Sequence, residues 1–182
     1  LGECEAVACE DTRVTSKLLA RYKLSVPLVS NRERSADKDI RMIIDMLQQG
    51  NRVVYVTDAG TPGISDPGNR LVEAAVQQHI PVIPIPGVSA VTALISIAGI
   101  DMKEFLFLGF PPHKKGRKTF FERIAMSDIP VVYYESPHRV VKNIALLSEM
   151  VPDRHMLIGR EMTKMHEEIV RGTVDHIAQS FL

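Results

Sequence analysis

The feature that most constrains this sequence is the alternation of short apolar runs with loops and amphipathic segments. Residues 52–57 are rich in β-branched and aromatic side chains, which is typical of a strand, and a loop rich in glycine and proline, residues 58–68, follows them. Residues 37–49 place apolar side chains at helical spacing, and Gly50 ends that pattern. Strands that alternate with helices predict a mostly parallel sheet with helices packed on it.

The same alternation continues along the chain and predicts the α/β fold class. It pauses near residues 99–104, so we expect one α/β domain over residues 1–104 and a second over residues 105–182. The expected strands span residues 6–9, 27–30, 52–57, 80–85, 105–110, 131–135, 156–160 and 168–172. The expected helices span residues 12–24, 37–49, 86–98, 119–125, 137–150 and 173–181, with one more that carries Leu71, Val72, Ala75 and Val76.

The balance of charge excludes nucleic-acid binding through a broad basic surface. The 182 residues carry 22 Lys and Arg against 22 Asp and Glu, so the formal net charge is zero. Proteins that bind nucleic acid through broad electrostatics usually carry a basic excess. Any contact with RNA must therefore be local.

Membrane and secretory segments are also not expected. Prolines interrupt the longest uncharged stretch, residues 80–100, so it lacks the continuous apolar length of a membrane span. The start of the chain lacks the basic and apolar regions of a signal peptide. Cys4 and Cys9, in C-x4-C spacing, fit free thiols in a reducing compartment. These features predict a cytoplasmic protein.

Two loops follow predicted strands, at the sheet edge where α/β proteins bind ligands. Residues 58–63 contain glycines that allow close approach of the backbone, and residues 86–90 open a helix whose first N–H groups are unpaired. On spacing alone, simple turns are an equal alternative. The glycine spacing matches neither the dinucleotide nor the P-loop fingerprint. His166-Glu167 lacks the second histidine of a zinc site, so no metal is expected.

Ionisable residues cluster after three predicted strands, at residues 10–13, 133–139 and 159–167. Carboxylate, Arg, Lys and His side chains at a strand end can orient a substrate hydroxyl or a phosphate. The alternative is that each cluster is an ion-paired loop that holds the domains together. The basic run at residues 114–118 could contact phosphates, or it could be a solvated loop.

Six segments, in order along the chain, resemble the motifs of the ribosomal RNA small subunit methyltransferase I family. Residues 9–19 resemble A-E-D-T-R-x-[TS]-x-x-L-L, with Cys9 in place of Ala, and residues 58–68 match D-A-G-T-P-x-I-S-D-P-G. The other four segments are residues 86–90 (P-G-x-S-A), 107–112 (F-x-G-F-x-P), 134–139 (Y-E-S-P-H-R) and 160–167 (R-E-x-T-K-x-[HY]-E). The resemblance covers essentially the whole chain.

The resemblance implies two α/β domains of the tetrapyrrole methylase type, with S-adenosylmethionine bound in the cleft between them. It further implies 2′-O-methylation of a cytidine ribose in the decoding region of 16S rRNA, usually by a homodimer in the bacterial cytoplasm. The small ribosomal subunit is the implied partner. The family pattern begins with a strand and a T-P-I-G-N-L-x-D loop, and many members end in a further extension. We expect this chain to lack both segments.

Position by position, the resemblance also implies site residues. The implied cofactor-binding residues are Asp58, Gly60, Thr61, Pro62, Ile64, Gly87, Ser89, Ala90, Tyr134 and Met162. A ribose hydroxyl is a poor nucleophile until its proton leaves, so a base or a cation is needed. The candidates for that role are Lys164, if it is buried, Glu161 and Glu135. The candidates for RNA phosphate contacts are Arg13, Lys114, Lys115, Arg117, Lys118 and Arg139.

Two alternatives remain at this stage. One is a methyltransferase that acts on a tetrapyrrole or another substrate that is not RNA. The other is a fragment that binds RNA without catalysis. A folded chain without affinity for S-adenosylmethionine would favour the RNA-binding fragment. Methyl transfer to small ribosomal subunits would distinguish an RNA methyltransferase from one that acts on another substrate.

Overall fold

A computed structural model describes residues 1–32 and 37–181 of the chain. The chain divides into two compact units, Leu1–Ser89 and Ala90–Leu182. The second unit therefore begins at a helix, upstream of the pause in the pattern near residues 99–104. The division into domains at residues 104 and 105 remains a prediction.

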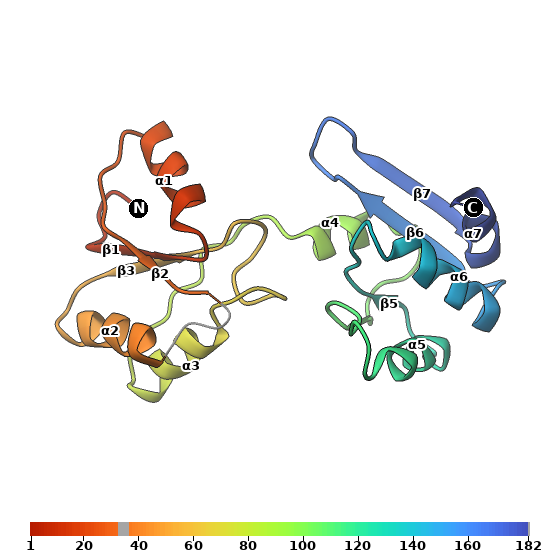
Figure 1. Ribbon diagram of the computed structural model, residues 1–182, viewed down its shortest axis with the longest axis horizontal. Helices are drawn as coiled ribbons and strands as arrows, with labels where there is room; N and C mark the ends of the chain where they lie inside the picture. Colours follow the sequence, from red (N-terminus) through yellow and green to blue (C-terminus); the bar gives the residue numbers. More distant parts are fainter. Residues whose placement is uncertain (33–36, 182) are drawn as a thin grey trace. The chain divides into compact units, whose positions relative to one another are not determined.

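The first unit is built on a three-stranded parallel sheet with strand order β2-β1-β3 (Figure 1). The strands are β1 (Ala6–Cys9), β2 (Leu28–Ser30) and β3 (Val53–Val56). Helix α1 (Thr12–Arg21) lies on one face of the sheet, and α2 (Asp37–Gln48) and α3 (Asn69–Gln77) lie on the other. All four residues of the central strand β1 are buried, as expected for a strand covered on both faces.

The core of the first unit confirms the helical periodicity of residues 37–49. Ile40, Ile43 and Ile44 of α2 point inward together because positions three and four apart share one face of a helix. They pack with Ala8 of β1 and with α3, and complete burial of one such isoleucine contributes roughly 1.5–3 kcal/mol. The buried members of this cluster are Ala8, Ile40, Ile43, Ile44, Leu71 and Ala75.

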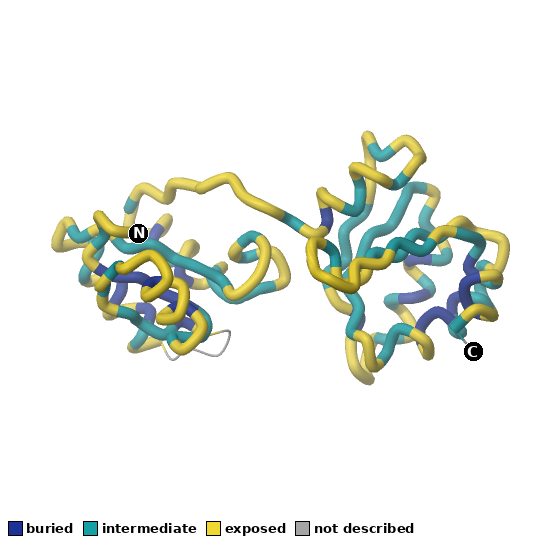
Figure 2. The backbone as a smooth tube through the Cα atoms, turned by 90° about the horizontal axis from the view of Figure 1, so that it is seen from above, coloured by how far each residue is buried: buried dark blue, intermediate teal, exposed yellow. Residues whose placement is uncertain are grey.

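The strand expected over residues 80–85 is wrong. No ladder partner for this segment lies among the described residues, and residues 81–88 are exposed throughout (Figure 2). A strand needs a neighbour for its N–H and C=O groups. Pro81 and Pro84 remove two donors from the segment, and Pro86 follows it directly. Apolar composition alone therefore did not produce a strand here.

The second unit holds two small sheets. Strands β4 (Leu106–Phe107) and β5 (Val131–Val132) pair in parallel, and β6 (His155–Arg160) and β7 (Glu168–Thr173) form an antiparallel hairpin. The strands expected over residues 105–110 and 131–135 are therefore shorter than predicted. The helices are α4 (Ala90–Ser96), α5 (Arg117–Ala125), α6 (Val140–Met150) and α7 (Val174–Phe181).

Helices α5, α6 and α7 supply the core of the second unit. Phe121 and Ile124 of α5 pack with Leu147 of α6 in one cluster, and Ile144 of α6 packs with Ile177 of α7 in another. The α/β fold class is confirmed. Among the helices in the described part of the chain, none has the length and apolar character needed to cross a bilayer.

Candidate functional site

The loop after β3 and the segment before α4 lie together in the first unit. Thr61 Oγ1 donates a hydrogen bond to the carbonyl oxygen of Val88, with an O···O distance of 3.1 Å. The two loops that the sequence assigned to the cofactor therefore meet at the carboxyl end of the sheet. A Cβ added at Gly60 or Gly87 would meet no atom within 4 Å, so both glycines border open space.

Positive φ angles shape the loop after β3. Gly60, Gly63 and Gly68 have φ angles of +69°, +79° and +127°, a range that glycine adopts without strain. Tyr55 of β3 holds the end of the loop, because its hydroxyl donates to the carbonyl oxygen of Pro67 at 2.7 Å. A Cβ at Gly68 would lie 2.5 Å from the Tyr55 ring, so this position has no room for a side chain.

Acidic side chains gather at the same edge of the sheet. Glu10 follows β1, and Thr57, which follows β3, lies 3.5 Å from it, measured from Oγ1 to Glu10 Oε2. Burial raises the pKa of Glu10, and the charges of Asp58 and Asp66 raise it further. Burial also raises the pKa of Asp66 and brings the pKa of Tyr55 to about 12. Within the described residues, no group of three potential ligands could hold a metal ion.

In the sequence, Glu10 belongs to the ionisable cluster at residues 10–13, but neither Glu10 nor Asp66 was named among the site residues. The position of Glu10 directly after a buried strand, where α/β sheets place ligand-binding side chains, identified the cluster but did not distinguish Glu10 from its neighbours. Asp58 was assigned as a cofactor contact, and the structure adds that its charge acts on Glu10.

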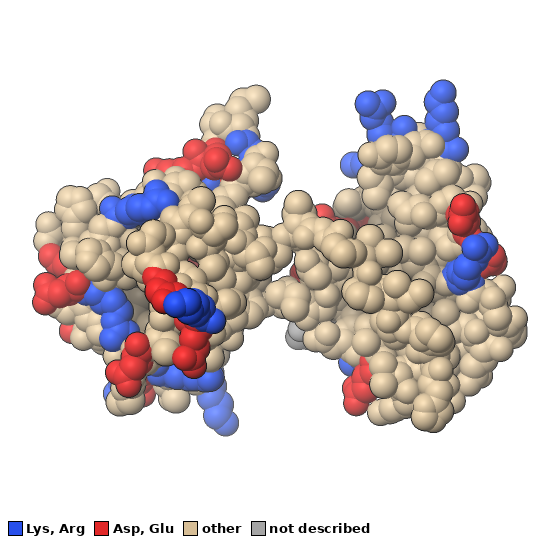
Figure 3. Space-filling model, turned by 180° about the vertical axis from the view of Figure 1, so that it is seen from behind, with Lys and Arg blue, Asp and Glu red and all other residues tan. Residues whose placement is uncertain are grey.

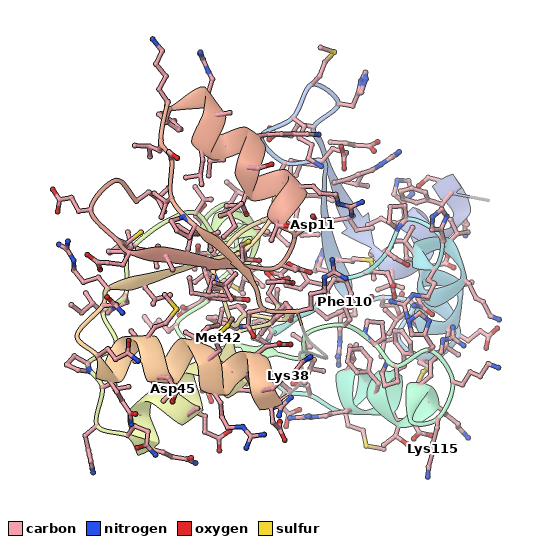
Figure 4. The ribbon with its side chains drawn as sticks, turned by 60° about the vertical axis from the view of Figure 1, so that its left-hand side comes forward. Asp11, Lys38, Met42, Asp45, Phe110 and Lys115 are labelled. Atoms are coloured by element: carbon pink, nitrogen blue, oxygen red, sulfur yellow. The ribbon has the colours of Figure 1, made fainter. Side chains whose placement is uncertain are left out.

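Helix α1 begins beside this acidic edge. Asp11 caps the helix by accepting from the backbone N–H of Arg13 at 2.8 Å, and its place at the start of α1 is visible in Figure 4. The Arg13 guanidinium also binds the Asp11 carboxylate, with an Nη2–Oδ2 distance of 2.5 Å. This pairing holds the pKa of Asp11 well below its usual range. Arg13 itself remains 82% exposed.

In the second unit, Tyr134 lies in an aromatic cluster at the end of the β4–β5 pair. Its ring centroid is 5.3 Å from that of Phe107 and 5.2 Å from that of Phe110. Its backbone N–H donates to the carbonyl oxygen of Gly109 at 2.8 Å, so the strand pairing continues loosely up to this residue. Phe110 is half exposed and carries the cluster to the surface.

Glu135, a candidate base, is held by three donors. Its Oε1 accepts from the backbone N–H of Ser136 at 2.7 Å and from Arg139 at 3.0 Å, and its Oε2 accepts from the side-chain amide of Asn143. Asn143 is only 1% exposed, and its Oδ1 in turn accepts from Arg117 Nε at 3.0 Å. We call Glu135, Asn143, Arg117 and Arg139 the carboxylate network.

The carboxylate network anchors the basic loop at both ends. Arg139 Nη1 donates to the carbonyl oxygen of Pro111 at the start of the loop, at 3.0 Å, and Arg117 stands at its end. Arg117 and Arg139 were both assigned to RNA phosphates, but their guanidinium groups are used within the protein. Lys114 and Lys115 between them are exposed, and Lys118 pairs with Glu122 at 3.6 Å.

The turn of the β6–β7 hairpin carries the other two candidate catalytic residues. Lys164 Nζ lies 3.2 Å from Glu161 Oε1, and the Lys164 side chain is 65% exposed, so the burial on which its candidacy depended is absent. Glu161 and Thr163 have φ angles of 48° and 68°, which non-glycine residues rarely adopt and which mark a strained turn. Met162 packs back on β6, because a Cβ at Gly159 would lie 2.7 Å from its sulfur.

Comparison with known proteins identifies the class of protein to which the chain belongs. The family described as Tetrapyrrole (Corrin/Porphyrin) Methylases matches residues 1–178. Cobalt precorrin-4 methyltransferase shares the fold, with a TM-score of 0.68 and 17% identity over 99% of this chain and 79% of that one. Uroporphyrin-III C-methyltransferase from Thermus thermophilus was solved with S-adenyl homocysteine. Its structure has a TM-score of 0.60 and 16% identity, over 100% of this chain and 82% of that one. The chain belongs to the tetrapyrrole methylase family of methyltransferases.

Curated relatives narrow this membership. Ribosomal RNA small subunit methyltransferase I of Thermotoga maritima is 38% identical over 181 residues, which cover 100% of this chain and 82% of that protein. The same enzyme of Coprothermobacter proteolyticus is 43% identical over 173 residues, which cover 94% of this chain and 78% of that protein. Within the tetrapyrrole methylases, the chain is a member of the ribosomal RNA small subunit methyltransferase I family, as the motifs predicted.

Proposed function

We propose that this protein transfers a methyl group from S-adenosylmethionine to the ribose 2′-oxygen of a cytidine in the decoding region of 16S rRNA. The observation that carries the proposal is sequence identity, over nearly all of this chain, to enzymes named for methylation of small subunit RNA. The proposal includes the small ribosomal subunit as partner, a homodimer and a cytoplasmic location.

The proposed cofactor site is the edge formed by the two joined loops. Bound S-adenosylmethionine supplies a methyl group on a positively charged sulfur, which leaves as a neutral thioether. Backbone and small side chains bordering open space at Gly60 and Gly87 suit a large, flat nucleoside. The residues that would hold it in the first unit are Asp58, Gly60, Thr61, Pro62, Ile64, Gly87 and Ser89, and those in the second are Ala90, Tyr134 and Met162.

The protein must align the ribose 2′-oxygen with the methyl group and take up the proton that leaves. Alignment alone can supply a large part of the acceleration of such an in-line displacement. Glu161 is the proposed acceptor of this proton, and Lys164, which is exposed, is the proposed cation beside it, because the strained hairpin turn holds the two side chains 3.2 Å apart. The raised pKa of Glu10 makes it a further candidate to accept a proton, besides Glu161 and Glu135.

Methyl transfer to purified small ribosomal subunits tests the proposal. Subunits from a strain without this methylation are incubated with tritiated S-adenosylmethionine, and resistance of the adjoining phosphodiester bond to alkali locates the 2′-O-methyl group. We expect the wild-type chain to label a single cytidine. Transfer to a tetrapyrrole in place of RNA would overturn the proposal.

Lys164→Ala tests the assigned pair within the same assay. We expect kcat to fall roughly 10²–10⁴-fold, the range for loss of a positioned proton-transfer group. Lys103→Ala is the matched control, because Lys103 also pairs with a nearby carboxylate, Asp101, at 3.3 Å on the surface of the second unit. If both variants retain wild-type kcat and RNA affinity, Lys164 has no role in the reaction.

A further inference from the structure

Helix α1 carries a line of three cations, of which only Arg13 has so far been assigned to RNA phosphates. Arg13, Lys17 and Arg21 follow one another at intervals of four residues, so they lie within about 80° of arc on one side of the helix and span about 12 Å along it. All three side chains are exposed. Lys23 adds a fourth cation directly after the helix. We call Arg13, Lys17 and Arg21 the α1 basic stripe.

The stripe concentrates positive charge in a chain whose net charge is zero. Helix α1 contains three cations and no carboxylate, whereas helix α2 mixes Lys38 and Arg41 with three aspartates. In the described part of the chain, neither Lys17 nor Arg21 pairs with an acidic residue, and Arg13 pairs with Asp11 only. Figure 3 shows Lys and Arg side chains gathered at the upper right, over the helix, without acidic side chains between them.

The stripe begins at the candidate site. Strand β1 ends at Cys9, Glu10 joins the acidic edge, and α1 starts at Thr12. An RNA strand whose ribose lies at that edge would meet Arg13 first and then Lys17 and Arg21. The inner side of the helix is already occupied, because Thr15 and Leu19 are buried.

We propose that the α1 basic stripe binds the phosphate backbone of the substrate RNA as it leaves the site. Spaced cations on one helical face match a polyanion, and phosphate contacts fix the register of an RNA without reading its sequence. Tyr22, 67% exposed beside the stripe, offers a ring for base stacking. The partly exposed Val14 and Leu18 form too small an apolar face for insertion into a lipid bilayer. The assignment to RNA rests on the proposed function.

The test compares two double variants that remove the same charge. Lys17→Gln/Arg21→Gln neutralises the stripe, and Lys38→Gln/Arg41→Gln neutralises two exposed cations of α2 on the other face of the sheet. Affinity for purified small-subunit rRNA is measured from 50 to 200 mM salt. We expect the stripe variant to reduce the slope of log K against log salt by about 1.4–1.8, as two phosphate contacts predict, and the α2 variant to leave it unchanged.

Further variants and controls distinguish failure of the stripe proposal from failure of the proposed function. Lys17→Arg/Arg21→Lys keeps both charges and is expected to retain the wild-type slope, and thermal melts of every variant check folding. Equal loss in the stripe and α2 variants, or no loss in the stripe variant, would overturn the stripe proposal alone. A wild-type chain that binds no rRNA would overturn the proposed function as well. Stripe-dependent binding to phosphatidylserine vesicles without RNA binding would assign the stripe to a membrane surface instead.

Discussion

Glu10 and Asp11 are adjacent carboxylates whose pKa values move in opposite directions. Burial next to Asp58 and Asp66 raises the pKa of Glu10, whereas hydrogen bonds from Arg13 lower that of Asp11. The charged form of Glu10 therefore opposes folding, and the charged form of Asp11 supports it. A charged residue that opposes folding at the carboxyl end of a parallel sheet is typical of a functional site.

Glu10→Gln is expected to stabilise the protein at neutral pH. Because the folded pKa of Glu10 lies above its unfolded value, stability is lost as pH rises from the unfolded pKa through the folded one, and glutamine removes this loss. We expect Tm to rise on the order of 1–3 °C at pH 7, with the gain disappearing near pH 3.

Thermal melts across this pH range provide the check for Glu10. Asp45 is an exposed carboxylate of α2, and Asp45→Asn is the control. We expect its Tm to stay close to that of the wild type at each pH. A lower Tm for Glu10→Gln than for the wild type at pH 7 would contradict the conclusion that the charge of Glu10 opposes folding.

At the scale of elements, loop 111–117 depends on a helix that follows it in sequence. The carboxylate network joins the start of α5, the segment after β5 and Asn143 of α6, and so fixes the loop that presents Lys114 and Lys115. Asn143 is buried and bonded to two charged groups, which explains an amide on the inner face of an otherwise apolar helix.

Asn143→Leu is expected to release the basic loop. The change removes the amide partner of Arg117 and one of the three donors that hold the nearly buried Glu135, at a cost of about 1–3 kcal/mol of unfolding free energy. We expect faster trypsin cleavage after Lys114 and Lys115 in native conditions, measured by mass spectrometry. Ser148→Ala, which removes one hydrogen bond to Asp175 from the same helix, serves as control. Equal cleavage rates in both variants would show that the network does not hold the loop.

At the scale of the whole molecule, zero net charge limits how the protein binds RNA. Two of the basic residues assigned to phosphates, Arg117 and Arg139, serve the carboxylate network. The cations that stay proposed for phosphate contacts form two groups, one in each compact unit: the α1 basic stripe in the first, and Lys114, Lys115 and Lys118 in the second. Binding should therefore involve few phosphates.

The salt dependence of RNA affinity measures this number. With about four to six phosphate contacts, we expect log K to fall with log salt with a slope of about −3 to −5 for the wild-type chain. Fluorescence anisotropy on an rRNA fragment between 50 and 200 mM salt gives the slope. A slope steeper than about −8 would mean that many more cations bind phosphate than these two groups contain.

Periodicity made the helices easier to predict than the strands. The spacing of Ile40, Ile43 and Ile44 depends only on the geometry of one helix, and all three are buried as expected. A strand depends on its neighbours, so residues 80–85 have the composition of a strand but lack the ladder of one. The same reason shortened the strands around Leu106 and Val131.

The sequence by itself determined the α/β fold class, the family and the two loops that meet through Thr61 and Val88, because ordered motifs and local spacing carry that information. Tertiary structure decided what the charged residues do. Glu135, Arg117 and Arg139 are polar side chains after strands or before helices, as catalytic or RNA-binding residues often are, but burial around Asn143 joins them to one another. Partners distant in sequence set the role of a charge, and only the folded chain brings them together.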